Sequence, residues 1–418
     1  MLQLNCINLM ENLKHEWYAN HDNMLYLLTY DNNKSCFMLK KTFLSNKRKR
    51  LIRKHEKIEF SVLGKNFFAH DALNIECPMT NYVFHRISTT DDEKLYNFAI
   101  CEIECQIDNF NIYKKLNNKV FSMIYCAIKL NFIEYNKKIY AIFKSNIDLS
   151  CDRLIGVTLR FRHALCFIFK NFHSGEFVAL ANDDNEQFIT CGARVNANRK
   201  YTIFEKPSSY DYINKQYANY EPNITDNFIN QFIKNTLDND FFYNVILLTL
   251  EESKYNIYLL SANAFVCLEI ISNYYIKSKK IQKELKDKIL KFKKHVKEYL
   301  DSNFEKDKQF IDHIHKKMSS ICQPTNADKL KLLFEMFNLN IDENDKKILK
   351  LRNKYLHGNL TEGEGKEMYD FNKYMAAHRM ASCLLAKISG YNGFIFSYDK
   401  FLTNQYPLPA IETVFIQV

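Results

Sequence analysis

The first half of the chain alternates short apolar runs with polar turns, which is typical of strands. The segment "NFHSGEFVALANDDNEQF" predicts a hairpin, with turn signals at His173–Gly175 and Asn182–Asn185. We therefore predict a strand-rich domain over residues 1–205, built as a sandwich or a bent open sheet. The β-branched or aromatic runs that predict its strands are "MLYLLTY", "CFMLKKTFL", "IEFSVLG", "AICEIECQID", "KIYAIFKS" and "CFIFKNF".

The pattern changes after residue 205. Residues 206–222 carry tyrosines separated by polar residues without a sustained period, which predicts a linker. From residue 223 the apolar positions recur at helical spacing almost to the end, where the tail returns to strand-like residues. The predicted fold class is α+β: a β-rich N-terminal domain, then an all-α helical bundle over residues 223–418.

Helix boundaries in the second half follow from capping residues. The predicted N-caps are Thr225 before "DNFINQFIKNTL", Asn326 before "ADKLKLLFEMF", and Asp342 or Asn344 before "DKKILKLRNKYLH". The last long helix should run to Ser389 and end at Gly390, because glycine readily follows a helix.

Length and composition indicate a folded chain with more than one domain. The 418 residues suffice for two or three domains, and nine glycines and six prolines exclude collagen-like and low-complexity classes. A net charge of +10 favours a polyanionic partner such as nucleic acid, although an AT-rich code raises the lysine content by itself.

The cysteines and the apolar runs argue against metal and membrane. Twelve cysteines include no CxxC pair, so we expect reduced core residues, no metal and no cofactor. The N-terminal sequence shows no signal peptide. No segment approaches the ~18 uninterrupted apolar residues of a spanning helix. We therefore expect a cytoplasmic protein without a membrane partner.

The stretch "LRNKYLHGNL" places polar groups on an amphipathic helix. On a helical wheel Arg352 falls within an apolar arc, while Asn353 and His357 lie at its edge. Arg352 can bind a buried carboxylate or helix-end carbonyls, with His357 as a cap. Alternatively, the three side chains converge on a phosphate, since arginine binds phosphate oxygens and histidine transfers protons near neutral pH. Glu269, acidic within an apolar run, would pair with Arg352 or orient Arg352 and His357 at such a phosphate.

The spacing Arg352-Asn353-x-x-x-His357 resembles the R-N-x-x-x-H signature of HEPN-domain ribonucleases, helical-bundle proteins common in toxins and antiviral defence. The following segment "DFNKYMAAHRMASCLLAKISGYNG" is similar to the closing helix and "GY" turn of ApeA-like HEPN proteins. The order of the two predicted domains also fits that group. The resemblance covers roughly residues 225–400.

The resemblance implies a metal-independent RNA endonuclease of an antiphage defence or toxin system, with a cyclic phosphate product. His357 would serve as base or acid at the 2′-hydroxyl or the leaving oxygen, Arg352 would hold the phosphate, and Asn353 would position them. The RNA would be tRNA or another single-stranded loop. One motif per chain implies a homodimer through the helical domain. The N-terminal domain would sense a phage-derived trigger, as a ligand-binding module. The alternative is a non-catalytic RNA-binding or scaffold protein.

Two basic segments either are exposed to solvent or bind nucleic acid. The helix from Lys277 to Lys297 carries lysines opposite its apolar stripe, as a solvated face or a track for RNA phosphates. The run from Asn46 to Lys57 is the densest in basic residues. His313 and His315, two residues apart on a predicted helix, point in different directions, which argues against a shared metal.

Overall fold

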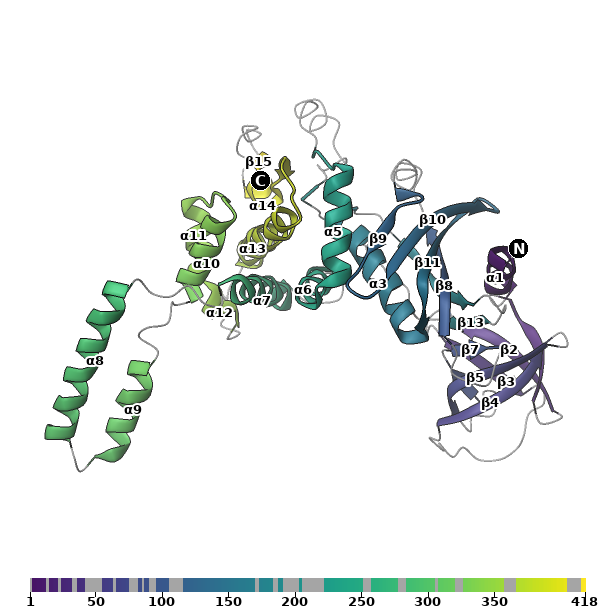
Figure 1. Cartoon of the computed structure of the whole chain (residues 1–418), viewed down its shortest axis with the longest axis horizontal. Helices are drawn as coiled ribbons and strands as arrows, with labels where there is room; N and C mark the ends of the chain where they lie inside the picture. The colour runs from purple at the N-terminus through teal and green to yellow at the C-terminus, as the bar shows by residue number, and fades with distance from the viewer. Residues whose placement is uncertain are drawn as a thin grey trace. The chain divides into compact units, whose positions relative to one another are not determined.

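The computed structural model describes two compact units (Figure 1). The strand-rich unit comprises Met1–Pro207 and Glu221–Ser253, and the helical unit comprises Ser208–Tyr220 and Lys254–Val418. The described residues are 2–12, 15–21, 24–31, 36–41, 55–62, 65–74, 82–84, 86–89, 95–104, 116–169, 173–182, 187–190, 203–204, 222–250, 257–276, 283–304, 307–319, 326–356, 366–403 and 415–418.

The strand-rich unit contains one antiparallel sheet. Its order is β4-β1-β2-β3-β6-β5-β7-β13-β12-β8-β11-β10-β9. Because β4 pairs with both β1 and β5, the first six strands close into a ring, and the remaining strands continue as an open sheet. The strands are β1 (Trp17–His21), β2 (Met24–Asp31), β3 (Cys36–Lys41), β4 (His55–Val62), β5 (Lys65–Asn74), β6 (Tyr82–Phe84), β7 (Arg86–Ser88), β8 (Leu95–Glu104), β9 (Val120–Ser122), β10 (Ala127–Tyr135), β11 (Lys138–Ser150), β12 (His173–Ala181) and β13 (Gln187–Thr190).

Two helices cover the open part of this sheet. Helix α1 (Leu2–Asn12) buries Cys6, Ile7 and Met10 in a core shared with the ring strands. Glu11 ties the end of α1 to β11 by accepting hydrogen bonds from Lys138 Nζ at 2.8 Å and Tyr140 Oη at 3.1 Å. Helix α3 (Cys151–Ile168) packs against β8, β11 and β12.

Helices α5 (Asp226–Asp238) and α6 (Asp240–Leu250) pack against α3. Arg160 on α3 donates to the carbonyl of Leu237 at 3.1 Å and pairs with Asp240, while His163 Nδ1 lies 3.1 Å from the hydroxyl of Tyr243. These contacts place residues 221–253 in the strand-rich unit, whereas the sequence analysis assigned residues from 223 onward to the helical domain.

The structure corrects two local predictions in the first unit. The run "CFIFKNF" was predicted as a strand, but Cys166–Ile168 form the last turn of α3, whose Leu154, Phe161 and Leu165 are buried on one side. The predicted turn at His173–Gly175 lies within β12, where the pairing with β8 shifts register between Ser174 and Val178. The hairpin β12–β13 itself is confirmed.

The helical unit is centred on two long helices, α7 (Ile257–Tyr275) and α13 (Lys366–Ile388), that pack against each other. Helix α10 (Asn326–Met336) and α12 (Arg352–Leu356) contact α7, while α11 (Glu343–Lys350) and α14 (Tyr398–Thr403) contact α13. Strands β14 (Phe394–Phe396) and β15 (Phe415–Gln417) form a small antiparallel pair.

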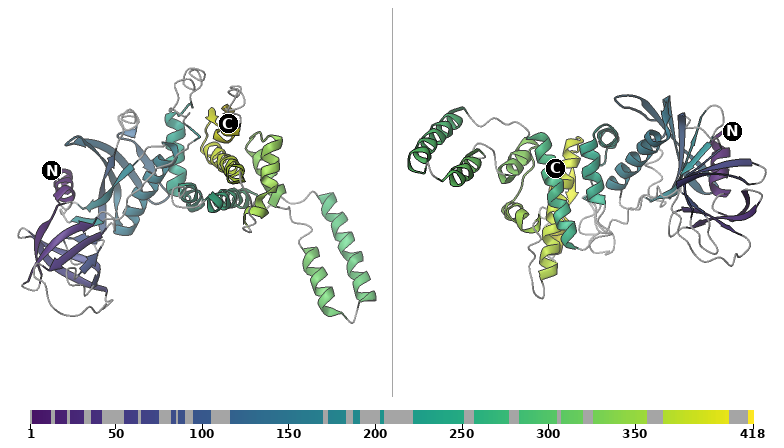
Figure 2. Two further views of the ribbon diagram at one scale, coloured as in Figure 1. Left: turned by 180° about the vertical axis from the view of Figure 1, so that it is seen from behind. Right: turned by 90° about the horizontal axis from the view of Figure 1, so that it is seen from below.

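Helices α8 (Lys283–Asn303) and α9 (Lys308–Ser319) form a helical hairpin in the same unit. The two helices run side by side in both views of Figure 2. The predicted α+β composition is therefore confirmed, with antiparallel strands in the first unit and mainly helices in the second. Among the helices described, none is long and apolar enough to cross a membrane.

The predicted caps Thr225 and Asp342 and the predicted helix stop at Gly390 agree with the structure, whereas the predicted cap Asn326 lies inside its helix. Thr225 accepts a hydrogen bond from the Phe228 amide at 3.2 Å, and Asp342 caps α11. Gly390 follows α13 with φ of +78°, a conformation that glycine adopts without strain. Asn326 is the first residue of α10. One expected helix is in fact two, because α11 ends at Lys350 and only its C-cap, Leu351, separates it from α12.

Candidate functional site

The short helix α12 carries Arg352 and Asn353 and lies against α7. The ring of Tyr355 stacks on Phe265 with centroids 5.6 Å apart and an interplanar angle of 20°. Arg352 Nε pairs with the Glu269 carboxylate. Glu269 follows Phe265 by one helical turn, whereas Arg352 precedes Tyr355 by three residues, so α12 runs antiparallel to α7 at this contact.

Arg352 is largely buried and held by a carboxylate. Its side chain is 17% exposed, and that of Glu269 is 22% exposed. Burial lowers the pKa of Arg352, and the nearby carboxylate favours the charged form. The sequence analysis gave a buried carboxylate as one interpretation of Arg352 and named Glu269 as a partner, and this pairing is confirmed.

The guanidinium keeps donors for a ligand. Nη1 of Arg352 donates to the side-chain oxygen of Asn353, its neighbour in the chain. An arginine has five N–H donors. Within the part of the chain that the structure describes, Glu269 and Asn353 occupy two of them, which leaves three for the oxygens of an anion. Such a fork suits the geometry of a phosphate.

The structure brings three of the four predicted site residues together. Asn353, which the helical wheel placed at the edge of the apolar arc, is exposed beside Arg352, and Glu269 reaches the pair from α7. The fourth, His357, lies outside the described residues, which end at Leu356 on α12 and resume at 366.

The break at Leu351 sets the direction of α12. The amide of Leu351 donates to the carbonyl of Ile348 at 2.9 Å, three residues back, and Lys354 donates to Leu351 in the same way at 2.9 Å. This tighter turn ends α11 and starts a new helix at Arg352. The side chain of Arg352 therefore takes its position from α12 and not from the continuous helix that the sequence predicted.

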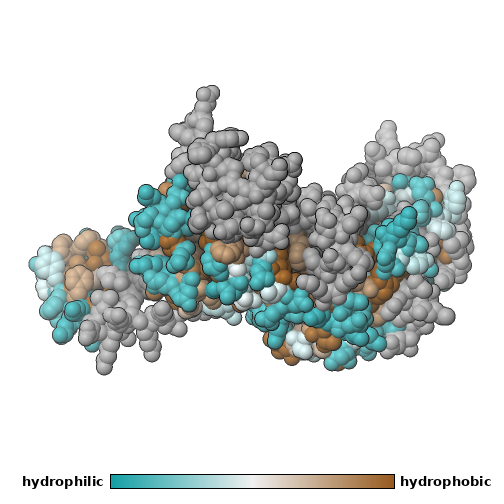
Figure 3. All heavy atoms as spheres, turned by 90° about the horizontal axis from the view of Figure 1, so that it is seen from above, coloured by the Kyte–Doolittle hydropathy of each residue, from teal (hydrophilic) through white to brown (hydrophobic). Residues whose placement is uncertain are grey.

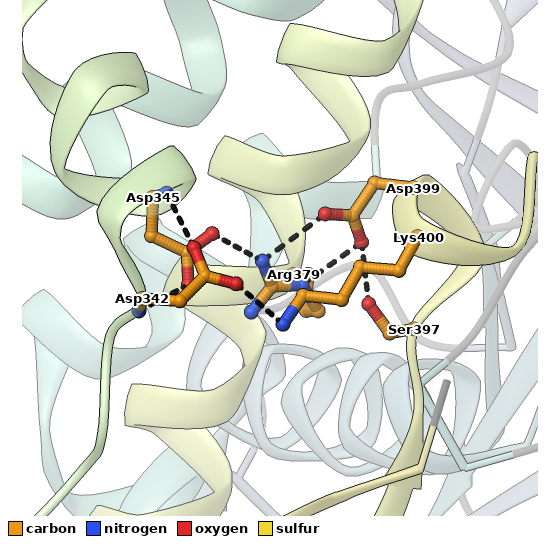
Figure 4. Close-up of polar contacts among 6 residues, drawn as sticks. All are labelled: Asp342, Asp345, Arg379, Ser397, Asp399 and Lys400. Carbon is orange, nitrogen blue, oxygen red and sulfur yellow. Dashed lines mark hydrogen bonds and ion pairs between the residues drawn. The ribbon is translucent and has the colours of Figure 1, made fainter. Parts of the chain in front are cut away.

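The other end of α11 is fastened by a buried ion network that the sequence analysis missed (Figure 4). Arg379 on α13 donates from Nη2 to Asp345 on α11 at 2.6 Å. Its Nε and Nη2 also bind the two oxygens of Asp399 on α14 at 2.9 and 3.1 Å. Side-chain exposures of 6% for Arg379, 2% for Asp345 and 4% for Asp399 place the network in the core.

Neighbouring groups complete the network. The hydroxyl of Ser397 donates to Asp399 at 2.7 Å, and Lys400 binds Asp342 at 2.8 Å. Asp342 and Asp345 form a capping box at the start of α11, in which each side chain accepts the other's backbone amide. Three helices, α11, α13 and α14, thus meet at one guanidinium, and α11 leads directly to Arg352.

Charge balance maintains this arrangement. Burial alone would lower the pKa of Arg379, but the attraction of Asp399 and Asp345 outweighs burial and raises it well above its ordinary value. Burial likewise raises the pKa of Asp399, yet the Arg379 charge and its hydrogen bonds bring the net pKa below the ordinary value. Arg379 and Asp399 are therefore charged at neutral pH.

The described part of the chain contains no metal site and no disulfide. There, no group of three or more His, Cys, Asp or Glu side chains is arranged to hold a metal ion. The cysteines whose side chains the structure describes are free thiols, and all of them except Cys151 are buried.

Comparisons of the chain with models of protein families, with curated proteins and with solved structures found no match. The likeness to the HEPN signature therefore rests on the residues of this chain alone.

A sequence signal for the missed network is visible in retrospect. Asp342 and Asp345 have capping-box spacing, and Arg379 interrupts the apolar segment "MAAHRMASCLL" much as Glu269 interrupts α7. A charged residue within an apolar helix needs a partner, so each of these positions predicts an ion pair. The sequence does not identify which partner it takes.

Proposed function

We propose that this chain is a metal-independent RNA endonuclease of an antiphage defence or toxin system, with its site on α12. The observation that supports this is Arg352, largely buried, held by Glu269 and contacting the exposed Asn353. His357 follows Asn353 by four residues in the sequence, in the HEPN-like pattern.

The reaction uses the substrate's own hydroxyl. The 2′-oxygen of the RNA attacks the adjacent phosphorus and gives up its proton, and the bond between phosphorus and the 5′-oxygen breaks as that oxygen gains a proton. The products are a 2′,3′-cyclic phosphate and a 5′-hydroxyl. His357 moves a proton at one of these oxygens. Arg352 neutralises the phosphate oxygens with its remaining donors, and Asn353 orients the reacting groups. Glu269 positions Arg352.

The site is proposed to form between two chains. The motif occurs once per chain, so two copies of α12 facing each other across a two-fold axis would supply two sets of Arg352 and His357 to one cleft. Mixing inactive His357→Ala chains with inactive Arg352→Ala chains would then restore partial activity if each half-site draws on both subunits. The strand-rich unit, in this proposal, binds the phage-derived trigger.

The test compares cleavage of RNA by the purified wild type and by His357→Ala and Arg352→Ala. We expect each substitution to reduce cleavage about a hundredfold or more, since acid–base and charge-stabilising groups contribute at that scale. Matched controls are His15→Ala and Arg153→Ala, which replace exposed side chains in the strand-rich unit and should cleave like wild type. Glu269→Gln should retain part of the activity, because the amide keeps the size of the side chain beside Arg352 and removes only its charge.

The products distinguish the mechanism from other nucleases. Cleavage should continue in excess EDTA, leave a cyclic phosphate on the 5′ fragment, and stop when the ribose at the cut lacks its 2′-hydroxyl. Equal cleavage by His357→Ala and wild type would refute the assignment. RNA binding without cleavage by folded wild type would instead support the non-catalytic alternative.

A further inference from the structure

The hairpin of α8 and α9 exposes aromatic side chains that a helical hairpin would ordinarily bury. Only Leu300 and Met318 are fully buried among the apolar side chains described on the two helices. In Figure 3, brown apolar spheres lie beside teal ones at the left end, where Figure 1 places this hairpin. The exposed large apolar side chains and their exposures are Leu290 51%, Phe292 55%, Tyr299 60%, Phe304 37% and Phe310 39%.

These aromatic rings form an ordered track. Phe292 and Tyr299 are seven residues apart on α8, so they lie on the same side of the helix, with His295 between them and Lys288 one turn before. The track continues around the end of the hairpin, since the ring of Phe304 lies 6.1 Å from Tyr299 and 5.0 Å from that of Phe310.

The same hairpin concentrates positive charge. Helices α8 and α9 contain ten lysines and five acidic residues, so 33 of the 418 residues carry a net +5 of the chain's +10. Lys288, Lys291, Lys294 and Lys297 are all exposed. By helical spacing, Lys288 lies on the aromatic side of α8 and Lys291 beside it, so these two place ammonium groups next to the track, whereas Lys294 and Lys297 lie on the opposite side.

We propose that the α8–α9 hairpin is a binding surface for single-stranded RNA. Bases would stack on Phe292, Tyr299, Phe304 and Phe310, and the lysines would bind the phosphates, as in sites that hold single strands without reading sequence. The inference rests on the proposed function only in its choice of RNA as ligand. A second copy of the hairpin fits this surface less well, because two +5 surfaces repel each other.

The test measures affinity for a fluorescein-labelled oligouridine by fluorescence anisotropy, with the full chain carrying His357→Ala so that the probe stays intact. Replacing Phe292 and Tyr299 together by alanine should weaken binding about tenfold per lost stacking contact. Lys288→Gln with Lys291→Gln should weaken binding and reduce its salt dependence, whereas the aromatic variant should keep its salt dependence. An RNA duplex of the same length should bind more weakly, because its bases are not available for stacking.

The control replaces two exposed tyrosines of the strand-rich unit, Tyr18 (66% exposed) and Tyr125 (46% exposed), by alanine and should bind like the parent protein. Unchanged oligouridine affinity in both hairpin variants would overturn the proposal. Loss of a dimer by light scattering in the aromatic variant, with affinity unchanged, would assign the surface to a second copy of the chain. Cleavage of RNA by wild type is measured separately, so binding without cleavage leaves this surface in place and removes only the proposed function.

Discussion

Replacing Arg379 with methionine should strongly destabilise the helical unit. The change removes the hydrogen bonds to Asp345 at 2.6 Å and to Asp399 at 2.9 and 3.1 Å and leaves both carboxylates in the core, with side chains 2% and 4% exposed. Removing one partner of a buried ion pair costs about 3–5 kcal/mol, because the remaining charge is neither solvated nor paired. Two carboxylates are left here, which places the expected loss at the upper end.

A matched substitution separates the effect of burial from that of charge. Lys400 pairs with Asp342 at 2.8 Å in the same network, but the Asp342 side chain is 46% exposed. An exposed ion pair contributes about 0–1 kcal/mol, so Lys400→Met should change the stability by no more than that. Hydrogen exchange of α11, α13 and α14, followed by mass spectrometry, measures both losses in the helical unit alone. The fluorescence of the single tryptophan, Trp17, reports on the strand-rich unit. This unit should unfold at the same urea concentration in both variants as in wild type.

Lowering the pH should change the free energy of unfolding of the helical unit in opposite directions in wild type and in Arg379→Met. In wild type the pKa of Asp399 is below its ordinary value of 3.8, so its contribution is present above that pH and is lost as the pH falls through the folded pKa. In the variant, burial without the Arg379 charge raises the pKa of Asp399, so acid neutralises this carboxylate and relieves the penalty. The destabilisation by Arg379→Met should therefore shrink as the pH is lowered from 7 to 5. A loss below 1 kcal/mol at pH 7, or one that grows on acidification, would refute the reasoning.

Two further predictions concern the strand-rich unit. Burial, and then the charge of Arg162, lower the pKa of His163 from 6.5 to about 4, so the free energy of unfolding of this unit should fall by up to about 3 kcal/mol as the pH falls from 6.5 to 4. Urea unfolding followed by Trp17 fluorescence measures this loss, and His163→Gln should remove the pH dependence. A stability of wild type that does not change with pH in this range would contradict the prediction. Thr225→Ala should cost about 1 kcal/mol by removing the cap of α5 that Phe228 donates to, while Thr225→Ser should retain it; hydrogen exchange at α5 measures both, and equal protection in the two variants would exclude the cap.

Elements marked by local chemistry were predictable from the sequence. Thr225, Asp342 and Gly390 mark their helix ends because each satisfies a backbone requirement within its own few residues. The pairing of Arg352 with Glu269 was among the predicted alternatives because each charge interrupts an apolar pattern. Such signals do not depend on the rest of the fold.

Features decided by tertiary packing were not predictable. The segment that begins at Cys166 has residues typical of a strand, yet its first residues belong to α3. This helix packs against β8, β11 and β12, and that tertiary contact outweighs the local preference. No glycine or proline near Leu351 marks the break between α11 and α12 in the sequence. Arg379 and Asp399 are 20 residues apart and meet only because α14 folds back on α13, which no local pattern shows.

The docking of α1 has a consequence for the time course of synthesis. Glu11 binds Lys138 and Tyr140, which follow it by 127 and 129 residues. At about 5–20 residues per second, these partners are made on the order of ten seconds after α1. During that interval Cys6, Ile7 and Met10 can contact the ring strands, which are made earlier, but they lack the residues of β11 and β12 that share their core in the folded unit. A nascent chain of this protein therefore exposes part of the apolar face of α1 until β11 and β12 are made, and chaperones that bind such segments should engage it during that interval.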